Sequence, residues 1–98
     1  MANKACRINP NANTGAFTQC DPLNSNVDVT IGAPAGQPTD MVFNAADASA
    51  ATTEFSAGRF FQVVAGQAPY MMRFNPSTTW VRSSTTSGGY TITFLFQW

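Results

Sequence analysis

The last nine residues, from Tyr90 to Trp98, constrain the fold more than any other segment of this chain. Every second position carries a large apolar side chain, and Thr, Leu and Gln fill the positions between. Alternation with a period of two, carried by aromatic and β-branched residues, predicts a β-strand with one buried face. Such a strand would promote aggregation if that face stayed in water. We therefore expect a central strand of a sheet, or a strand that docks on another subunit.

Shorter segments of the same character precede it, separated by turn-forming Gly, Pro, Asn and Ser residues. Short strands with turn signals about every ten residues are typical of antiparallel sandwiches and small barrels. The sequence therefore predicts an all-β fold, a small antiparallel β-sandwich or barrel of about six or seven short strands. The segments expected to form the earlier strands are 27–31, 39–43, 59–65, 70–74 and 78–82.

Short connections suggest how the strands of the second half are ordered. Residues 66–69 have the length of a hairpin loop, and residues 75–77 form a further turn around Pro76. Consecutive strands joined by such turns usually pair with one another. We therefore predict a four-stranded meander over residues 59–98.

Two segments of the first half are predicted to lie outside the strands. Residues 32–38 contain two glycines and two prolines and are expected to form a loop. Residues 44–51 fit two alternatives. One is a helical turn capped by Asn44 with Asp47 in its first turn, and the other is an Ala-rich loop with one turn of helix.

The first 26 residues are rich in turn-forming side chains and poor in large apolar ones. We therefore expect residues 1–26 to form an extended N-terminal arm and residues 27–98 to form a single β-domain. Residues 16–18 fit a short edge strand within the arm. Since the arm has little to pack against itself, it should either wrap the domain or reach a neighbour.

Cys6 and Cys20 are the only two cysteines, and they flank a polar segment of the arm. A disulfide between them would close a loop worth about 3 kcal/mol in the chain-entropy model. The alternative is two free thiols, because we expect no signal peptide in residues 1–20 and hence a reducing compartment. Structural zinc takes four Cys or His ligands, so with no His we expect no metal site.

Charged residues make up 10% of the chain, well below the ~25% of a typical globular domain. Solubility therefore depends on Asn, Gln, Ser and Thr, and such a neutral polar surface suits packing against neighbours. The sequence pI is about 6.0 and the arginines are scattered, which argues against a nucleic-acid partner. No segment approaches the ~20 apolar residues of a membrane helix, so we expect no transmembrane segment and no membrane partner.

Catalysis is disfavoured because the chain has no His, the commonest general base. Ser–His and Cys–His nucleophile pairs are therefore excluded within this chain. The glycine-rich segments lack the Lys-Ser or Lys-Thr of a phosphate loop. We expect no enzymatic activity and no cofactor.

Aromatic side chains are the remaining candidates for ligand binding. Tyr70 and Trp80 combine an apolar ring with a polar tip and could form a stacking platform for a glycan. The alternative for these rings is a place in the hydrophobic core, which a small sandwich also needs. A glycan-binding β-sandwich that uses exposed aromatics is accordingly the second functional hypothesis.

The small size, all-β pattern, neutral polar surface and turn-rich first segment resemble those of small virion proteins of bacteriophages. The likeness is to capsid decoration (cement) proteins and small head or tail subunits. It covers the general character of the chain, and no residue roles carry over from it. The resemblance implies a small β-domain, often trimeric, that reinforces a capsid lattice in a virion assembled in the host cytoplasm.

The primary functional hypothesis is therefore a non-enzymatic structural subunit that acts through protein–protein contacts. We expect a homo-oligomer, with a trimer favoured, bound to a capsid or another lattice. Large apolar residues of the arm and of the last strand are the candidates for assembly contacts. They are Phe17, Leu23, Phe94, Phe96 and Trp98.

Overall fold

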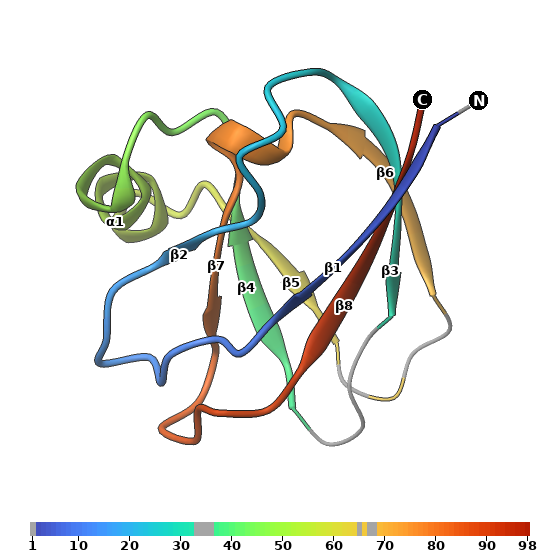
Figure 1. The fold of residues 1–98 in the computed structure, drawn as a ribbon. Helices are drawn as coiled ribbons and strands as arrows, with labels where there is room; N and C mark the ends of the chain where they lie inside the picture. Colours follow the sequence, from blue (N-terminus) through green and yellow to red (C-terminus); the bar gives the residue numbers. More distant parts are fainter. Residues whose placement is uncertain (1, 33–36, 65, 67–68) are drawn as a thin grey trace.

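The computed structural model describes residues 2–32, 37–64, 66 and 69–98, which fold into two facing antiparallel sheets of four strands each (Figure 1). Sheet A has the order β1-β8-β3-β6, and sheet B has the order β2-β7-β4-β5. This confirms the predicted all-β class, with eight strands in place of six or seven. Sheet A consists of β1 (Asn3–Ile8), β8 (Ile92–Gln97), β3 (Val27–Gly32) and β6 (Tyr70–Phe74). Sheet B consists of β2 (Thr18–Gln19), β7 (Trp80–Ser83), β4 (Thr39–Val42) and β5 (Phe61–Val63).

The last strand is central, as its alternation predicts. β8 pairs with β1 on one side and with β3 on the other. Ile92, Phe94 and Phe96 point between the sheets and are fully buried. Leu95, on the opposite face, is 37% exposed. The strand thus completes the chain's own sheet.

The main hydrophobic core fills the space between the sheets. Each sheet contributes alternate residues of its strands, so that the period-two pattern of the sequence becomes an inner and an outer face. Fully burying one such aliphatic or aromatic side chain stabilises the fold by about 1.5–3 kcal/mol. The largest fully buried apolar side chains of this core are Phe94, Phe96, Ile31, Met41, Ile92, Val27, Val29, Val63 and Val81.

A helix covers the outer face of sheet B (Figure 1). α1 (Ala48–Ser56) places Ala51 and Phe55 against Phe17 and Val42, in a second, smaller core. All four residues of β4 are therefore buried, since sheet A lies on one side and α1 on the other. The helix is longer than the single turn expected, and Asp47, not Asn44, is its N-cap. The Asp47 carboxylate accepts a hydrogen bond from Ala50 N at 2.7 Å.

The first 26 residues do not form an extended arm. β1 pairs with β8 along its whole length, and β2 pairs with β7 at the edge of sheet B. The N-terminal segment therefore supplies one edge strand to each sheet. An edge strand needs only backbone hydrogen bonds and a few apolar side chains, such as the buried Ile8 and Phe17. The composition was therefore a poor guide here, although the short strand expected near residues 16–18 is found at Thr18–Gln19.

The predicted meander over residues 59–98 is wrong. β5 pairs with β4, and β6 pairs with β3 in the other sheet. The four strands of this region alternate between sheets B and A, so consecutive strands cross the sandwich in place of forming hairpins. Residues 67–68 of the expected 66–69 connection, and residues 33–36 of the expected 32–38 loop, lie outside the described residues.

Three of the later strands begin two residues after their predicted starts, and the first of them, β5, begins at Phe61 and not at Arg59. Thr78 closes the short 3-10 helix η1 (Pro76–Thr78), whose cap is Asn75, so β7 begins at Trp80. Tyr90 lies before β8, and its hydroxyl is 2.7 Å from Thr39 Oγ1 in β4. That hydrogen bond ties the entry of β8 to the opposite sheet.

Candidate functional site

Four of the five residues predicted to make assembly contacts are inside the subunit. Phe94 and Phe96 are fully buried, and Phe17 is 3% exposed beneath α1. Leu23 is half-buried and packs against the main core. Trp98 remains available at the surface, because it is 47% exposed.

Tyr70 and Trp80 are not brought together, because their strands belong to different sheets. The Trp80 indole packs in the core under α1, and its Nε1 donates a hydrogen bond to Ala45 O at 2.8 Å. The Tyr70 ring meets the Phe61 ring edge-on, with 5.4 Å between centroids. Its hydroxyl accepts a hydrogen bond from Val64 N at 3.2 Å. Both aromatic side chains therefore act as packing residues in this fold.

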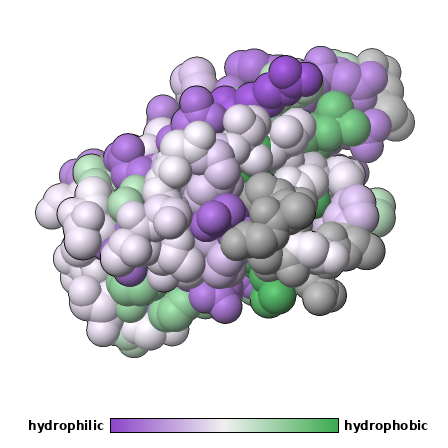
Figure 2. All heavy atoms as spheres, turned by 90° about the horizontal axis from the view of Figure 1, so that it is seen from below, coloured by the Kyte–Doolittle hydropathy of each residue, from purple (hydrophilic) through white to green (hydrophobic). Residues whose placement is uncertain are grey.

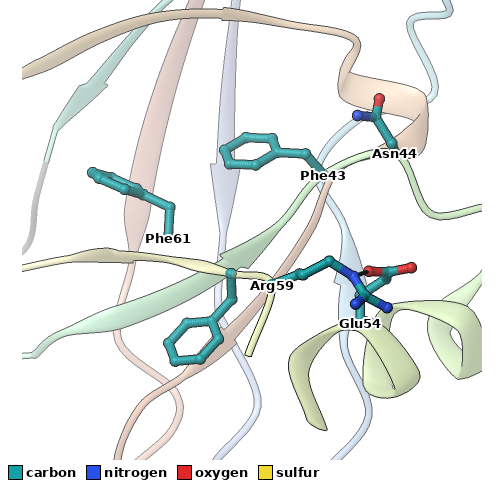
Figure 3. Close-up of a pocket in the computed structure, with 6 residues that line it drawn as sticks. Phe43, Asn44, Glu54, Arg59 and Phe61 are labelled. Carbon is teal, nitrogen blue, oxygen red and sulfur yellow. Dashed lines mark hydrogen bonds and ion pairs between the residues drawn. The ribbon is translucent and has the colours of Figure 1, made fainter. Parts of the chain in front are cut away.

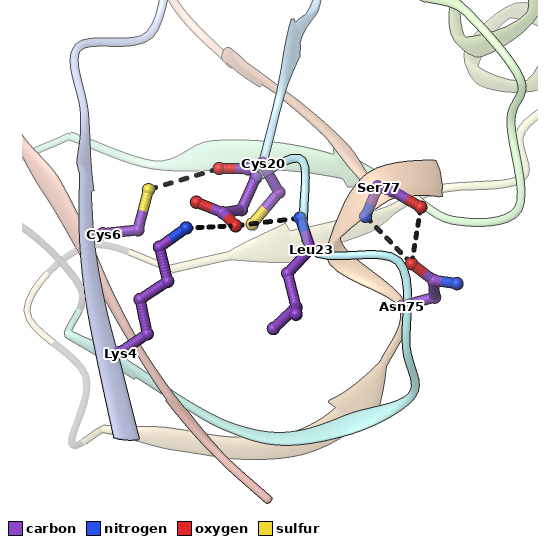
Figure 4. A network of polar contacts seen from close by, with 7 residues as sticks. Lys4, Cys6, Cys20, Leu23, Asn75 and Ser77 are labelled. Carbon is purple, nitrogen blue, oxygen red and sulfur yellow. Dashed lines mark hydrogen bonds and ion pairs between the residues drawn. The ribbon is translucent and has the colours of Figure 1, made fainter. Parts of the chain in front are cut away.

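Cys6 and Cys20 lie side by side where β1 passes the end of β2 (Figure 4). Both thiols are free, and the Cys6 thiol donates a hydrogen bond to Cys20 O at 3.3 Å. Burial raises the pKa of both thiols, and more strongly that of Cys20, which is 2% exposed. Since the thiolate is the reactive form, both cysteines are poor nucleophiles at neutral pH. The disulfide between them stays a prediction.

An ion pair joins the same two segments (Figure 4). Lys4 Nζ lies 2.9 Å from Asp21 Oδ2, and Leu23 N donates to that oxygen at 3.0 Å. Burial by itself would raise the pKa of Asp21. The hydrogen bonds from Lys4 and Leu23 outweigh it, so the pKa of Asp21 is lowered from its ordinary value. The pair fastens β1 of sheet A to the segment that follows β2 of sheet B.

The outer face of sheet A carries exposed apolar side chains that the sequence analysis missed. Leu95 pairs with Ala5 and Thr30, and Thr30 pairs with Met71, so these four residues form one row across the sheet, here called the outer row. Met71 is 84% exposed and lies on β6, which has no further strand beside it among the described residues. The sequence signal that could have revealed Met71 is the alternation within residues 70–74, because it places Met71 on the other face of the strand from Tyr70 and Met72.

The rest of the surface is mostly polar and uncharged. Figure 2 views one end of the sandwich, where pale and purple spheres predominate and green, apolar spheres stand in small separate groups. Besides Met71, Leu95 and Trp98, the exposed large apolar residues of the described chain are Phe60 and Val64, which flank β5. Exposed apolar surface is therefore limited to a few positions in strands or directly beside them.

A hollow lies where β4 and β5 meet the end of α1 (Figure 3). Its volume is about 500 Å³. Arg59 reaches toward Glu54 of α1 and forms an ion pair with it, while the Phe43 and Phe61 rings lie to one side. Phe60, 41% exposed, and Asn44 complete the lining. We refer to these six residues as the first hollow.

A second hollow of about 370 Å³ adjoins the first, because Phe43 and Asn44 line both. Asparagine side chains and the strand β6 supply most of its wall. Its other lining residues are Asn26, Met72, Arg73, Phe74, Asn75 and Thr79. The two hollows together are called the end groove.

Arg82 is a buried cation beneath α1. Its guanidinium carbon lies 4.2 Å from the centre of the Phe17 ring and 4.9 Å from that of Phe55. Nη1 donates to Gly15 O at 3.2 Å, and Nε has no hydrogen-bond partner among the described residues. Contacts with two aromatic faces replace the counter-ion that a buried charge usually has.

Within the described part of the chain, no three His, Cys, Asp or Glu side chains gather as a metal site would require. The helix that it contains is too short to cross a membrane. No known protein family, curated protein or solved structure matches this chain. Inferences about function therefore depend on the chemistry of the surface itself.

Proposed function

We propose that this chain is a non-enzymatic structural subunit that acts through protein–protein contacts, with copies of itself and with a larger lattice. The observation that carries the proposal is the 84% exposure of Met71 on the edge strand β6. An apolar side chain beside an unpaired strand edge favours pairing with a strand of another chain. Leu95, on the same outer row, extends the apolar surface inward from that edge.

The partner that we assign to β6 is β1 of a second copy. Neighbouring strands of sheet A run antiparallel, so β6 and β1, at its two edges, also run in opposite directions. Placing β6 of one copy beside β1 of the next therefore continues the antiparallel order. When two different surfaces of identical subunits bind each other, the contact repeats from copy to copy. The copies form a closed ring if the rotation that relates one copy to the next is a whole fraction of a full turn. The ring that we propose is a trimer, in line with the resemblance to decoration proteins.

The charges along these two edges are compatible with close approach. Lys4 on β1 is paired with Asp21, and Arg73 on β6 lies 3.0 Å from Asp28, which leaves Arg7 on β1 as the one charged side chain of these two strands outside the ion pairs of the described residues. The net charge of the chain is zero, so copies do not repel one another at long range. The setting that we propose is a bacteriophage virion, in which the ring binds and reinforces a capsid lattice. The composition of the chain supports this setting.

The test is the mass in solution, measured by light scattering after size exclusion over a range of concentrations. We expect the mass of three subunits for the unaltered chain. Met71→Lys should yield a monomer, because a lysine on an edge strand opposes strand pairing. Val64→Lys is the matched control, since Val64 is 44% exposed but follows β5 of sheet B. A monomer for the unaltered chain at every concentration, or equal effects of the two lysines, would refute the proposal.

A further inference from the structure

We propose that the end groove binds a neutral oligosaccharide, a chain of hexopyranose rings. The first hollow lies away from the strand edge that joins copies, because its lining comes from α1, β5 and the end of β4, whereas the second hollow borders that edge through Met72, Arg73 and Phe74 of β6. The groove also differs from the Tyr70 and Trp80 platform that the sequence suggested. The proposal does not depend on assembly.

The floor of the first hollow is aromatic and held in place. Phe43 and Phe61 are half-buried and pack against the main core. Phe43 also contacts Phe74 of sheet A, with 5.4 Å between ring centroids. At the rim, Phe60 is 41% exposed and packs against Phe55 with the rings tilted by 39° and 4.5 Å between centroids. These rings offer fixed apolar surface to the C–H faces of a sugar ring.

The polar groups of the first hollow suit hydroxyl groups. Glu54 supplies acceptors, Arg59 supplies donors, and the Asn44 amide supplies both. A sugar hydroxyl donates and accepts, so it can use all three side chains. The charges of Glu54 and Arg59 neutralise each other in an ion pair, so the hollow does not favour an ionic ligand. This balance indicates a neutral ligand.

The backbone fixes these polar groups before any ligand arrives. Arg59 N donates to Glu54 O at 2.9 Å, and Gly58 between them has a φ of 82°, a left-handed turn that ends α1. Asn44 has a φ of 58°, which is uncommon for a residue other than glycine. Such conformations are found preferentially at ligand sites, where the surrounding structure holds them. The backbone at this site would therefore lose little conformational freedom when a ligand binds.

The second hollow extends the site in one direction. It shares Phe43 and Asn44 with the first hollow and adds Phe74, the amide of Asn26 and the amide of Asn75, which is already hydrogen-bonded to Asn24 and Ser77. Phenylalanine rings and asparagine amides thus repeat along the groove, and its charged side chains, Glu54, Arg59 and Arg73, are held in ion pairs. The repetition indicates a ligand that is itself a repeat of similar rings, and not a single small molecule.

The test is a nuclear magnetic resonance titration of the full chain with maltohexaose, cellohexaose and mannohexaose, and with a neutral peptide of alternating Ser and Ala. At least one sugar should shift the amide signals of Phe43, Asn44 and Phe60 in a saturable way. Asn44→Gly retains the backbone conformation and removes the amide, and Phe60→Ala removes the ring. Each should weaken binding about 5-fold, and Val64→Ala, outside the groove, should leave it unchanged.

The spectrum of each variant reports whether it is folded, so loss of binding is separable from loss of structure. The proposal is overturned if none of the three sugars causes saturable shifts, or if the shifts map to Tyr70 and Trp80. It is also overturned if both groove variants bind as tightly as the unaltered chain. Binding of the Ser-Ala peptide as tight as that of the best sugar would likewise overturn it, in favour of a peptide site.

Discussion

The two sheets of this sandwich differ in the length of their strands, including the strands at their edges. Strands of sheet A have five or six residues, whereas those of sheet B have two to four. The edges of sheet A, β1 and β6, are therefore long enough to pair with another strand. Those of sheet B, β2 and β5, offer two and three residues, and very short edge strands resist such pairing.

The outer faces of the two sheets also differ, because one is covered by a helix and the other is not. Sheet B is covered by α1, so β4 is buried on both faces and Arg82 lies under the helix. Sheet A has no helix over it among the described residues, and its outer row includes Met71 and Leu95. Sheet B is therefore covered within the subunit, whereas sheet A keeps an uncovered outer face and two long edge strands.

The largest effect should come from the centre of sheet A. Phe94→Ala should lower the free energy of unfolding by about 3–5 kcal/mol, because it leaves a cavity between the sheets. Leu95→Ala, the next residue on the outer face, should cost about 1 kcal/mol or less. Urea unfolding of both variants measures the difference. Equal losses would show that the two faces of β8 are not inner and outer as described.

A smaller effect is expected at the buried cation of sheet B. Arg82→Ala should cost about 2–3 kcal/mol, because it removes packing and two aromatic contacts. Arg82→Met keeps the length of the side chain and should stay within about 1 kcal/mol of the unaltered chain. Chemical unfolding distinguishes the two. A Met variant as unstable as the Ala variant would mean that the positive charge itself is needed beneath α1.

The link between the sheets should respond to acid. Since folding lowers the pKa of Asp21, its ionised form stabilises the fold above the unfolded value of 3.8, and this contribution is lost as pH falls through the lower folded pKa. Stability should therefore decrease in acid less steeply for Asp21→Asn than for the unaltered chain. Denaturant midpoints at pH 7 and pH 3 report the difference. If the stability of both proteins fell by the same amount between pH 7 and pH 3, the stabilising role of ionised Asp21 would be contradicted.

The smallest effect concerns the thiols at the same junction. Because burial raises both pKa values and more strongly that of Cys20, a maleimide should label folded Cys6 before Cys20 at neutral pH. Mass spectrometry of the labelled peptides measures the order. Faster labelling of Cys20 would mean that β1 opens readily from its place beside β2.

The last strand, β8, was the most predictable element, for a physical reason. Phe94 and Phe96 alternate with Thr93 and Leu95, and a sheet with one buried face produces that pattern directly. β4 is buried on both faces, so it shows no such alternation, and its strand was inferred from neighbouring turns. The helix was foreseen only as a single turn, because its apolar contacts depend on Ala51 and Phe55, which carry a weak periodic signal.

Pairing partners could not be predicted from local pattern. The sequence marks where the chain reverses, but the choice between a hairpin and a crossing to the other sheet depends on contacts remote in sequence. β1 and β8, at opposite ends of the chain, pair along six residues, from Asn3 with Gln97 to Ile8 with Ile92. Residues 1–26 were therefore expected to be an arm. The same long-range contacts determine which side chains line the end groove, so sequence pattern did not indicate it.

Hydrogen exchange as a function of protein concentration tests the central claim most directly, that sheet A is the sheet that joins copies. The amides of β1 and β6 should become more protected as concentration rises, while those of β2 and β5 should not change. Met71→Lys should abolish the concentration dependence. Protection that grows at β2 or β5, or that stays independent of concentration at all four edges, would contradict the account.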